Sequence, residues 1–355
     1  MLCYVGNLTS LIVKKFNLLT KNIGILIVLF IPTSLTAHDQ DSKKSQRVKS
    51  ELFQEELVYK NTRRTYSVFS PTSTSTESRP LLIGLHGYYG NGKEFAEKTA
   101  NIIDDLTERD YVGIFPDGES MSLQKPHITS FNDIDSQNST GTDGATCIYS
   151  SYDYGVYDNC PKSQHEDQCN WGSSCSDDEG FFRKLIEIAI EKWRVDPRRV
   201  YLTGFSQGAQ TVQSLAWRMS DVIAAVAPQS GFAANGFSKA PLSKMSFVQV
   251  WSPSDRTVDG TDRASEDGMI YESASETFST WATAQNCETE ASPYATSYDG
   301  KNGWECSEHR NCKNRSLVIS CIWNGGHAWV NDPAHDVMFD VFERHFLTSI
   351  QEENR

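Results

Sequence analysis

Apolar residues recur along this chain in short continuous runs separated by segments with helical spacing. Six runs are followed by Gly, Pro or a polar turn, as strands buried on both faces are: "PLLIGL" (80–85), "YVGIF" (111–115), "VYLTG" (200–204), "IAAVAP" (223–228), "FVQVW" (247–251) and "SLVISCIW" (316–323). Helical spacing occurs near residues 93–108, 177–195, 207–219, 270–285 and 334–348. This alternation predicts an α/β fold with a mostly parallel central sheet and helices on both faces.

Two segments depart from this alternation. Residues 38–56 are polar and charged and are expected to form a loose leader before an edge strand in "RRTYSVF" (63–69). From about residue 117 to 176 the chain is rich in Ser, Asp, Asn and Tyr, with four cysteines toward its end. Because a structureless loop of that length is unusual, we expect a disulfide-pinned insertion or lid within a single domain over residues 57–350.

The N-terminal segment has the order of a secretory signal. The first 37 residues contain no Asp or Glu; Lys14, Lys15 and Lys21 precede the apolar run 23–31, and the segment ends at Ala37. We expect cleavage after Ala37 and a secreted or periplasmic protein without stable membrane association. An uncleaved anchor is the alternative, but the run is shorter than the roughly 20 residues that span a bilayer.

Charge and cysteine content narrow the class further. Without residues 1–37 the chain has 30 basic and 46 acidic residues, a formal net charge of −16, so a nucleic-acid partner is not expected. An even number of cysteines behind a secretory signal predicts up to four disulfides of open connectivity. A zinc site with His165 or His309 is the alternative, but no C-x-x-C pair occurs and no metal is expected. The eight cysteines are Cys147, Cys160, Cys169, Cys175, Cys287, Cys306, Cys312 and Cys321.

The stretch "GFSQG" places Ser206 between Gly204 and Gly208, after a predicted strand and before a predicted helix. A sharp strand-to-helix turn lifts a serine hydroxyl clear of the sheet, and its glycines remove side chains where strand and helix crowd together. The alternative is a Gly-rich turn with a surface serine. We expect Ser206 to be a nucleophile.

A serine hydroxyl is a weak nucleophile unless a histidine takes its proton. His327, in "CIWNGGHAWV", follows an apolar strand and two glycines, where such a base belongs. His309 lies among cysteines, and His335 and His345 fall in the last helical pattern. His327 is therefore the expected base.

The base in turn needs a carboxylate that orients it. Asp255 directly follows the predicted strand 247–251 and is the expected acid. Asp259, Asp262 and Asp267 lie farther into the same loop and are the alternatives, since a loop aspartate is most often a turn or cap residue.

The oxyanion of an acyl-transfer intermediate needs two backbone N–H donors. Gln207, at the start of the helix after Ser206, is expected to supply one, and Tyr88 of "LHGYYGNG" the other, with Tyr89 as second choice. The alternative for this loop is a plain tight turn. Four aromatic residues could line an acyl or sugar site or simply pack in the core: Tyr89, Trp171, Phe205 and Trp329.

Several motifs together resemble those of one family. They occur in the order seen in secreted esterases of the polyhydroxybutyrate depolymerase and feruloyl esterase group, carbohydrate esterase family 1, and cover roughly residues 60–348. The motifs are "RPLLIGLHGYYGNG", "CNWGSSCSDDEGFFRKLI", "WRVDPRRVYLTGFSQGAQ", "AAVAPQSG", "SPSDRTV" and "GGHAW".

The resemblance implies an α/β-hydrolase fold and hydrolysis of carboxylic esters through an acyl-enzyme. It implies Ser206 as nucleophile, Asp255 as orienting acid and His327 as base, with no cofactor. The expected substrate is feruloylated or acetylated plant cell-wall polysaccharide. The resemblance to feruloyl esterases also implies a disulfide between Cys287 and Cys321.

Other functions stay open at this stage. An extracellular polyhydroxybutyrate or polyester depolymerase is the second enzyme hypothesis. "GFSQG" is also similar to cytosolic carboxylesterases and acyl-protein thioesterases, which the signal and cysteines oppose. A third class is an inactive α/β-hydrolase used for binding, but such proteins often lack a catalytic residue, whereas all three candidates are present here.

Overall fold

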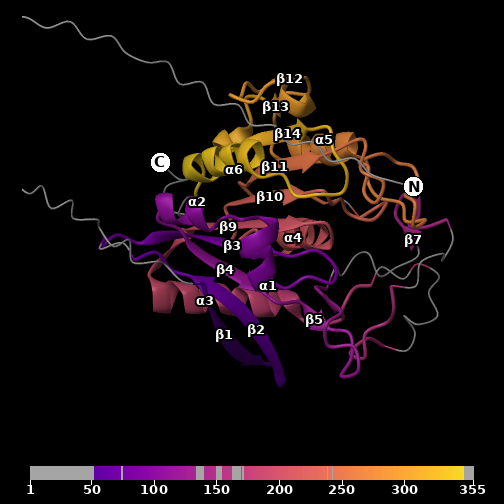
Figure 1. The fold of residues 1–355 in the computed structure, drawn as a ribbon. Helices are drawn as coiled ribbons and strands as arrows, with labels where there is room; N and C mark the ends of the chain where they lie inside the picture. The colour runs from indigo at the N-terminus through magenta and orange to yellow at the C-terminus, as the bar shows by residue number, and fades with distance from the viewer. Residues whose placement is uncertain are drawn as a thin grey trace, which may run out of the picture. The chain divides into compact units, whose positions relative to one another are not determined.

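The predicted buried runs are neighbouring strands of one sheet (Figure 1). Every adjacent pair in the order β4-β3-β9-β10-β11-β14 is parallel. The expected mostly parallel α/β sheet is therefore confirmed. These strands are β3 (Arg79–Leu85), β4 (Val112–Pro116), β9 (Val195–Phe205), β10 (Ala225–Gln229), β11 (Ser246–Trp251) and β14 (Val318–Ile322).

The computed structural model describes residues 52–347, apart from 73–74, 133–139, 149–153, 162–168, 170–171, 238 and 242. Val48–Arg355 is one of two compact units of the chain, and everything below concerns it. The predicted signal peptide, the leader up to residue 51 and Trp171 lie outside the described residues. In the part of the chain that is described, no helix is both long and apolar enough to cross a membrane.

Antiparallel strands extend the sheet at both edges. β1 (Leu52–Tyr59) pairs with β2 (Thr62–Phe69), and β2 pairs with β4. The leader therefore ends earlier than residue 56, and the strand predicted at the edge lies one position inside it. Lys60 and Asn61 have φ values of 46° and 66°, which suit a two-residue turn matched to the strand twist. The apolar pattern did not predict β1, because every side chain of this strand is half-buried or exposed and none is buried.

The other edge carries β13 (Glu305–His309) and β12 (Ala291–Pro293), which the apolar pattern does not predict. β13 lies antiparallel to β14 and places Cys306 directly opposite Cys321. These two cysteines form a disulfide, and Cys287 pairs with Cys312. The bridge between Cys287 and Cys321 implied by the family resemblance is therefore wrong, because the unpredicted strand β13 supplies the partner of Cys321.

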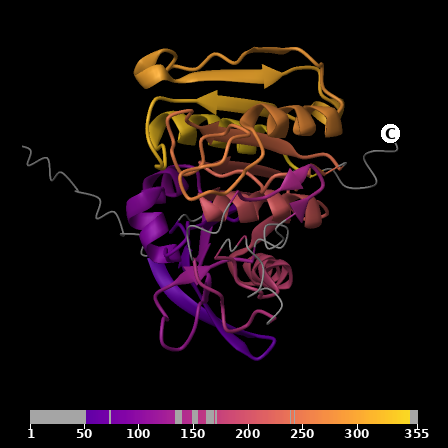
Figure 2. The same cartoon turned by 90° about the vertical axis from the view of Figure 1, so that its right-hand side faces the viewer.

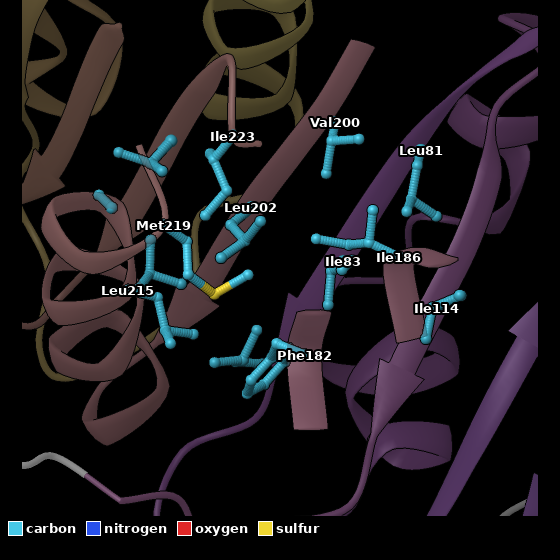
Figure 3. Close-up of a cluster of buried hydrophobic side chains, with 14 of the residues drawn as sticks. Leu81, Ile83, Ile114, Phe182, Ile186, Val200, Leu202, Leu215, Met219 and Ile223 are labelled. Atoms are coloured by element: carbon cyan, nitrogen blue, oxygen red, sulfur yellow. The ribbon is translucent and has the colours of Figure 1, made fainter. Parts of the chain in front are cut away.

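Helices cover both faces of the sheet. In β3 the side chains at odd positions from Leu81 to Leu85 pack against the helices on one face, and Leu82 packs against the helices on the opposite face, because side chains alternate along a strand. Figure 3 shows Phe182, Leu215 and their neighbours closing the first layer over Leu81 and Ile83. The first layer has α3 (Asp178–Trp193), α4 (Gln207–Arg218) and α5 (Ala274–Ala284); the second has α1 (Gly92–Glu94), a π-turn (Phe95–Thr99), α2 (Ile103–Glu108) and α6 (Asp332–Arg344). Figure 2 shows α3 and the short purple helices on opposite sides of the sheet.

The predicted insertion is pinned by disulfides. Cys147 pairs with Cys169 and Cys160 with Cys175. Its described parts contain only two short hairpins, and Cys147 also bridges Met269 in the loop after β11. The insertion is therefore attached to the loop that carries Asp255. The hairpins are β5 (Glu119–Ser120) with β6 (Thr129–Ser130), and β7 (Thr140–Gly141) with β8 (Gly144–Ala145).

A buried histidine follows α6. Ser246 Oγ accepts the N–H of Leu317 and is hydrogen-bonded to His345 Nδ1 at 2.7 Å. Burial, with a smaller contribution from the Lys244 charge, lowers the pKa of His345 to about 3. His345 is therefore neutral in the folded protein at pH values where an unfolded histidine takes up a proton.

Acid should destabilise the fold through His345. Between the unfolded pKa near 6.5 and the folded value of about 3, only the unfolded chain binds this proton, so stability falls as the pH falls through that window. We expect the free energy of unfolding to drop by about 1.2 kcal/mol more in wild type than in His345→Phe between pH 6 and 5. Urea unfolding at fixed pH measures this. If the free energy of unfolding depends equally on pH in the two proteins, His345 is not the group responsible. A loss of stability that is the same at every pH does not affect this comparison.

Candidate active site

Ser206 lies on a sharp turn between β9 and α4. Its φ and ψ are 56° and −122°, and its N–H donates to Gln229 O at 3.1 Å on the neighbouring strand. A Cβ on Gly204 would lie 2.5 Å from the carbonyl oxygen of Gly208, and one on Gly208 would meet the carbonyl oxygen of Leu85 at 2.5 Å. Both glycines are therefore required by close packing, and the turn has the strained geometry of a nucleophile elbow.

Two loops at the carboxyl ends of neighbouring strands bring His327 and Asp255 to this serine. His327 Nε2 lies 2.8 Å from Ser206 Oγ, and His327 Nδ1 lies 2.7 Å from Asp255 Oδ2. A carboxylate only accepts, so Nδ1 carries the ring proton and Nε2 accepts the serine hydroxyl. The three predicted residues thus form one chain of hydrogen bonds.

Asp255 is held rigidly. Its side chain is fully buried, and Oδ1 accepts the N–H groups of Thr257 and Val258 at 2.9 Å each. These bonds leave Oδ2 for His327. The alternatives from the sequence are engaged elsewhere: Asp259 accepts from Thr261, and Asp267 from Ser265.

The other histidines considered from the sequence have separate partners. His309 Nδ1 is bonded to Glu288 O at 2.8 Å. His335 Nδ1 is 2.8 Å from Asp105 Oδ2, and its Nε2 accepts the indole N–H of Trp329 at 3.0 Å. Trp329 is therefore a buried packing residue, the alternative that the sequence left open.

The loop after β3 runs against Ser206. A Cβ on Gly87 would lie 3.1 Å from Ser206 Cβ. The N–H of Tyr89 donates to Thr129 O at 3.1 Å, so the second choice for the oxyanion donor is already engaged. The first N–H groups of a helix have no acceptor within it, and α4 begins at Gln207. Tyr88 and Gln207 remain the predicted donors.

A cavity of about 170 Å³ lies between this loop, the first turns of the helix that follows it and Phe205; Ser206 and His327 are not among its lining residues. Tyr89 and Phe205, two of the four predicted lining residues, form part of its wall, and the Phe205 ring lies 4.9 Å from the His327 ring. Tyr89 is 53% exposed, so the cavity opens beside it.

The sequence analysis missed the side chain of His86, which it took only as part of a turn. Gly118 N–H donates to His86 Nε2 at 2.9 Å, so Nδ1 carries the proton and donates to Gly87 O at 2.7 Å. Burial lowers the pKa of His86, which keeps the ring neutral and this arrangement intact. His86 therefore tethers the loop that faces Ser206. No local pattern points to Gly118, which lies in a different turn.

Loss of this tether should slow catalysis without abolishing it. We expect His86→Ala to lower kcat for p-nitrophenyl acetate about 10- to 100-fold, somewhat less than removal of an oxyanion donor costs. KM should change little, because the loop is expected to act on the intermediate. Steady-state kinetics on protein shown to be folded by circular dichroism measures this, and an unchanged kcat would show that the loop keeps its position without His86.

Parts of this chain are similar to known esterases. Residues 137–270 match the family described as Esterase PHB depolymerase, a segment with Ser206 and Asp255 but not His327. Feruloyl esterase B of Piromyces equi is 29% identical over 167 residues, 44% of this chain and 30% of that relative, so this chain spans less than a third of its length. The acetyl xylan esterase from Aspergillus awamori has a TM-score of 0.51 at 12% identity over 82% of this chain and 99% of that chain. The last comparison shows the shared fold.

Proposed function

We propose that this chain, a relative of the polyhydroxybutyrate depolymerase and feruloyl esterase group, is a serine carboxylic ester hydrolase. The observation that carries the proposal is the hydrogen-bond chain from Ser206 through His327 to Asp255, with Ser206 on a strained turn. A surface serine in a Gly-rich turn would have no reason to face a histidine held by a buried carboxylate.

The chemistry follows from this arrangement. As Ser206 Oγ attacks the ester carbonyl carbon, its proton passes to His327 Nε2, and the backbone N–H groups of Tyr88 and Gln207 hold the oxyanion. His327 then gives the proton to the leaving alcohol, and an acyl-enzyme remains. A water molecule loses a proton to His327, attacks the acyl carbon and releases the acid, and Ser206 recovers its proton. The cycle uses no cofactor.

The proposed substrates are feruloyl or acetyl esters of plant cell-wall polysaccharide. The names of the two relatives, a feruloyl esterase and an acetyl xylan esterase, support this choice. A polyester depolymerase is the second candidate, favoured by the matched family.

We further propose that the protein acts outside the cytoplasm. Four disulfides, among all eight cysteines after residue 37, fit an extracellular protein because cytosolic thiols are kept reduced. The predicted signal over residues 1–37 would direct this export.

Hydrolysis assays separate the candidates. The purified protein is offered p-nitrophenyl acetate, methyl ferulate and a 3-hydroxybutyrate trimer. The proposal expects turnover of the first two above the trimer. Preference for the trimer would favour the polyester hypothesis. If none of the three compounds is hydrolysed, the esterase proposal is wrong and the hypothesis of a binding protein remains.

A further inference from the structure

A second and larger pocket lies on the face of the sheet that α5 covers. Its volume is about 530 Å³, and it shares no lining residue with the 170 Å³ cavity beside Tyr89 and Phe205. Residues of β11, β14 and β13 form its floor, and the first turn of α5 with the loop 260–262 forms its wall. This size lies within the range of small-ligand sites. We call it the α5 pocket.

The floor of the α5 pocket is polar where core packing would favour apolar side chains. Farther along the same sheet face, Phe247 stacks on Trp281 at 4.3 Å and Val318 is buried. Toward the carboxyl ends of the strands this face instead carries Ser320, Ser307 and Glu305. Polar groups in a concavity contribute little to folding unless they are paired, so this change of character points to a ligand.

Ser320 supplies a directed donor. It is only 9% exposed, and its Oγ accepts hydrogen bonds from Gln249 Nε2 at 2.8 Å and from Trp251 Nε1 at 3.2 Å. Both lone pairs of the oxygen are thereby used, so its own hydrogen must be donated. Ser320 lines the pocket, and within the described residues its hydrogen has no recorded acceptor.

The rest of the lining sets the chemistry of the ligand. Asp262 and Glu305 present carboxylates, and no Lys or Arg is among the lining residues. Trp251, Phe278 and Ile322 add apolar surface. A ligand must therefore donate hydrogen bonds to carboxylates, accept one from a hydroxyl and offer C–H surface to an aromatic ring, while carrying no negative charge.

We infer that the α5 pocket binds a neutral sugar residue of the polysaccharide that carries the ester. A sugar meets all of these demands, whereas a polyester segment offers only acceptors and leaves the carboxylates without donors. Trp251 ends β11, whose following loop carries Asp255, and Ile322 ends β14, whose following loop carries His327. Both sites thus lie at the carboxyl ends of the same two strands. The link to an ester-bearing chain rests on the proposed function; binding of the sugar does not.

The test uses an ester-free probe and a substitution that fills the pocket. Ser275 is exposed at the start of α5 and lines the pocket, so Ser275→Trp should occlude it. Thr283→Trp, an exposed position farther along the same helix that does not line the pocket, is the matched control. Glu305→Gln, which removes one carboxylate at an exposed site, is the second variant. Binding of xylotetraose to each full-length protein is measured by isothermal titration calorimetry.

Xylotetraose should bind wild type and Thr283→Trp alike, at least about tenfold more weakly to Ser275→Trp, and several-fold more weakly to Glu305→Gln. On acetylated xylan, Ser275→Trp should raise KM, while kcat/KM for p-nitrophenyl acetate stays at the wild-type value. Equal binding to all four proteins, no binding to wild type, or displacement of xylotetraose by a 3-hydroxybutyrate trimer would overturn the inference. Sugar binding without any ester hydrolysis would instead reject the proposed function and keep the pocket.

Discussion

Replacement of Ser206 by alanine is expected to lower kcat/KM for p-nitrophenyl acetate by a factor of about 10⁴ to 10⁶. The alanine keeps the turn but removes the hydroxyl oxygen that is proposed to form the acyl-enzyme. What activity remains should come from the oxyanion donors and His327 acting on water. Stopped-flow and steady-state absorbance at the p-nitrophenolate band measure both phases.

The matched control for this variant is Ser214→Ala, which removes a hydroxyl from the middle of α4. It should retain wild-type kinetics. A Ser206→Ala protein that keeps a tenth or more of the wild-type rate while remaining folded would move the nucleophile to another residue.

Asp255→Asn is expected to lower kcat by about 10⁴ with little change in KM. The buried carboxylate accepts the Nδ1 proton of His327 and so keeps Nε2 ready to accept the proton of Ser206. An asparagine can turn its amide N–H₂ toward Nδ1, which places the ring proton on Nε2 and blocks that transfer. Single-turnover kinetics with p-nitrophenyl acetate separates this effect from slower deacylation.

Asp259→Asn is the control for that experiment, because Asp259 lies in the same loop and accepts from Thr261 rather than from His327. Asp259→Asn should lower kcat by less than about twofold. A large loss in Asp259→Asn and a small one in Asp255→Asn would reverse the assignment of the acid.

The parallel core of the fold could be predicted because its strands are buried on both faces and therefore read as continuous apolar runs. The edge strands could not. β1 alternates half-buried and exposed residues, and β13, "ECSEH", exposes Glu305 while burying Cys306 and His309. Stability at such edges comes from pairing with a neighbour distant in sequence, which no local pattern records. The error in the disulfide pairing followed directly, since Cys306 is found opposite Cys321 only once β13 is known.

The candidate site was predictable to the extent that its chemistry dictates where residues fall along the chain. Ser206, Asp255 and His327 each follow a strand that the apolar pattern reveals, and the fold brings strand ends together. The hydrogen bond between His86 and Gly118 joins two turns that are far apart in the sequence, so no sequence spacing predicts it. The sequence likewise left open whether Trp329 lines the site or packs in the core, and its bond to His335, which holds it in the core, could not be foreseen from the sequence.

The site of acylation tests the account most directly. The protein is mixed with p-nitrophenyl acetate, quenched in acid within the burst phase, digested and mapped by mass spectrometry. The account predicts one acetyl group, on the peptide and at the position of Ser206, which appears as fast as the burst of p-nitrophenolate. An acetyl group on a different residue, or full turnover with Ser206 unmodified at every quench time, would contradict it.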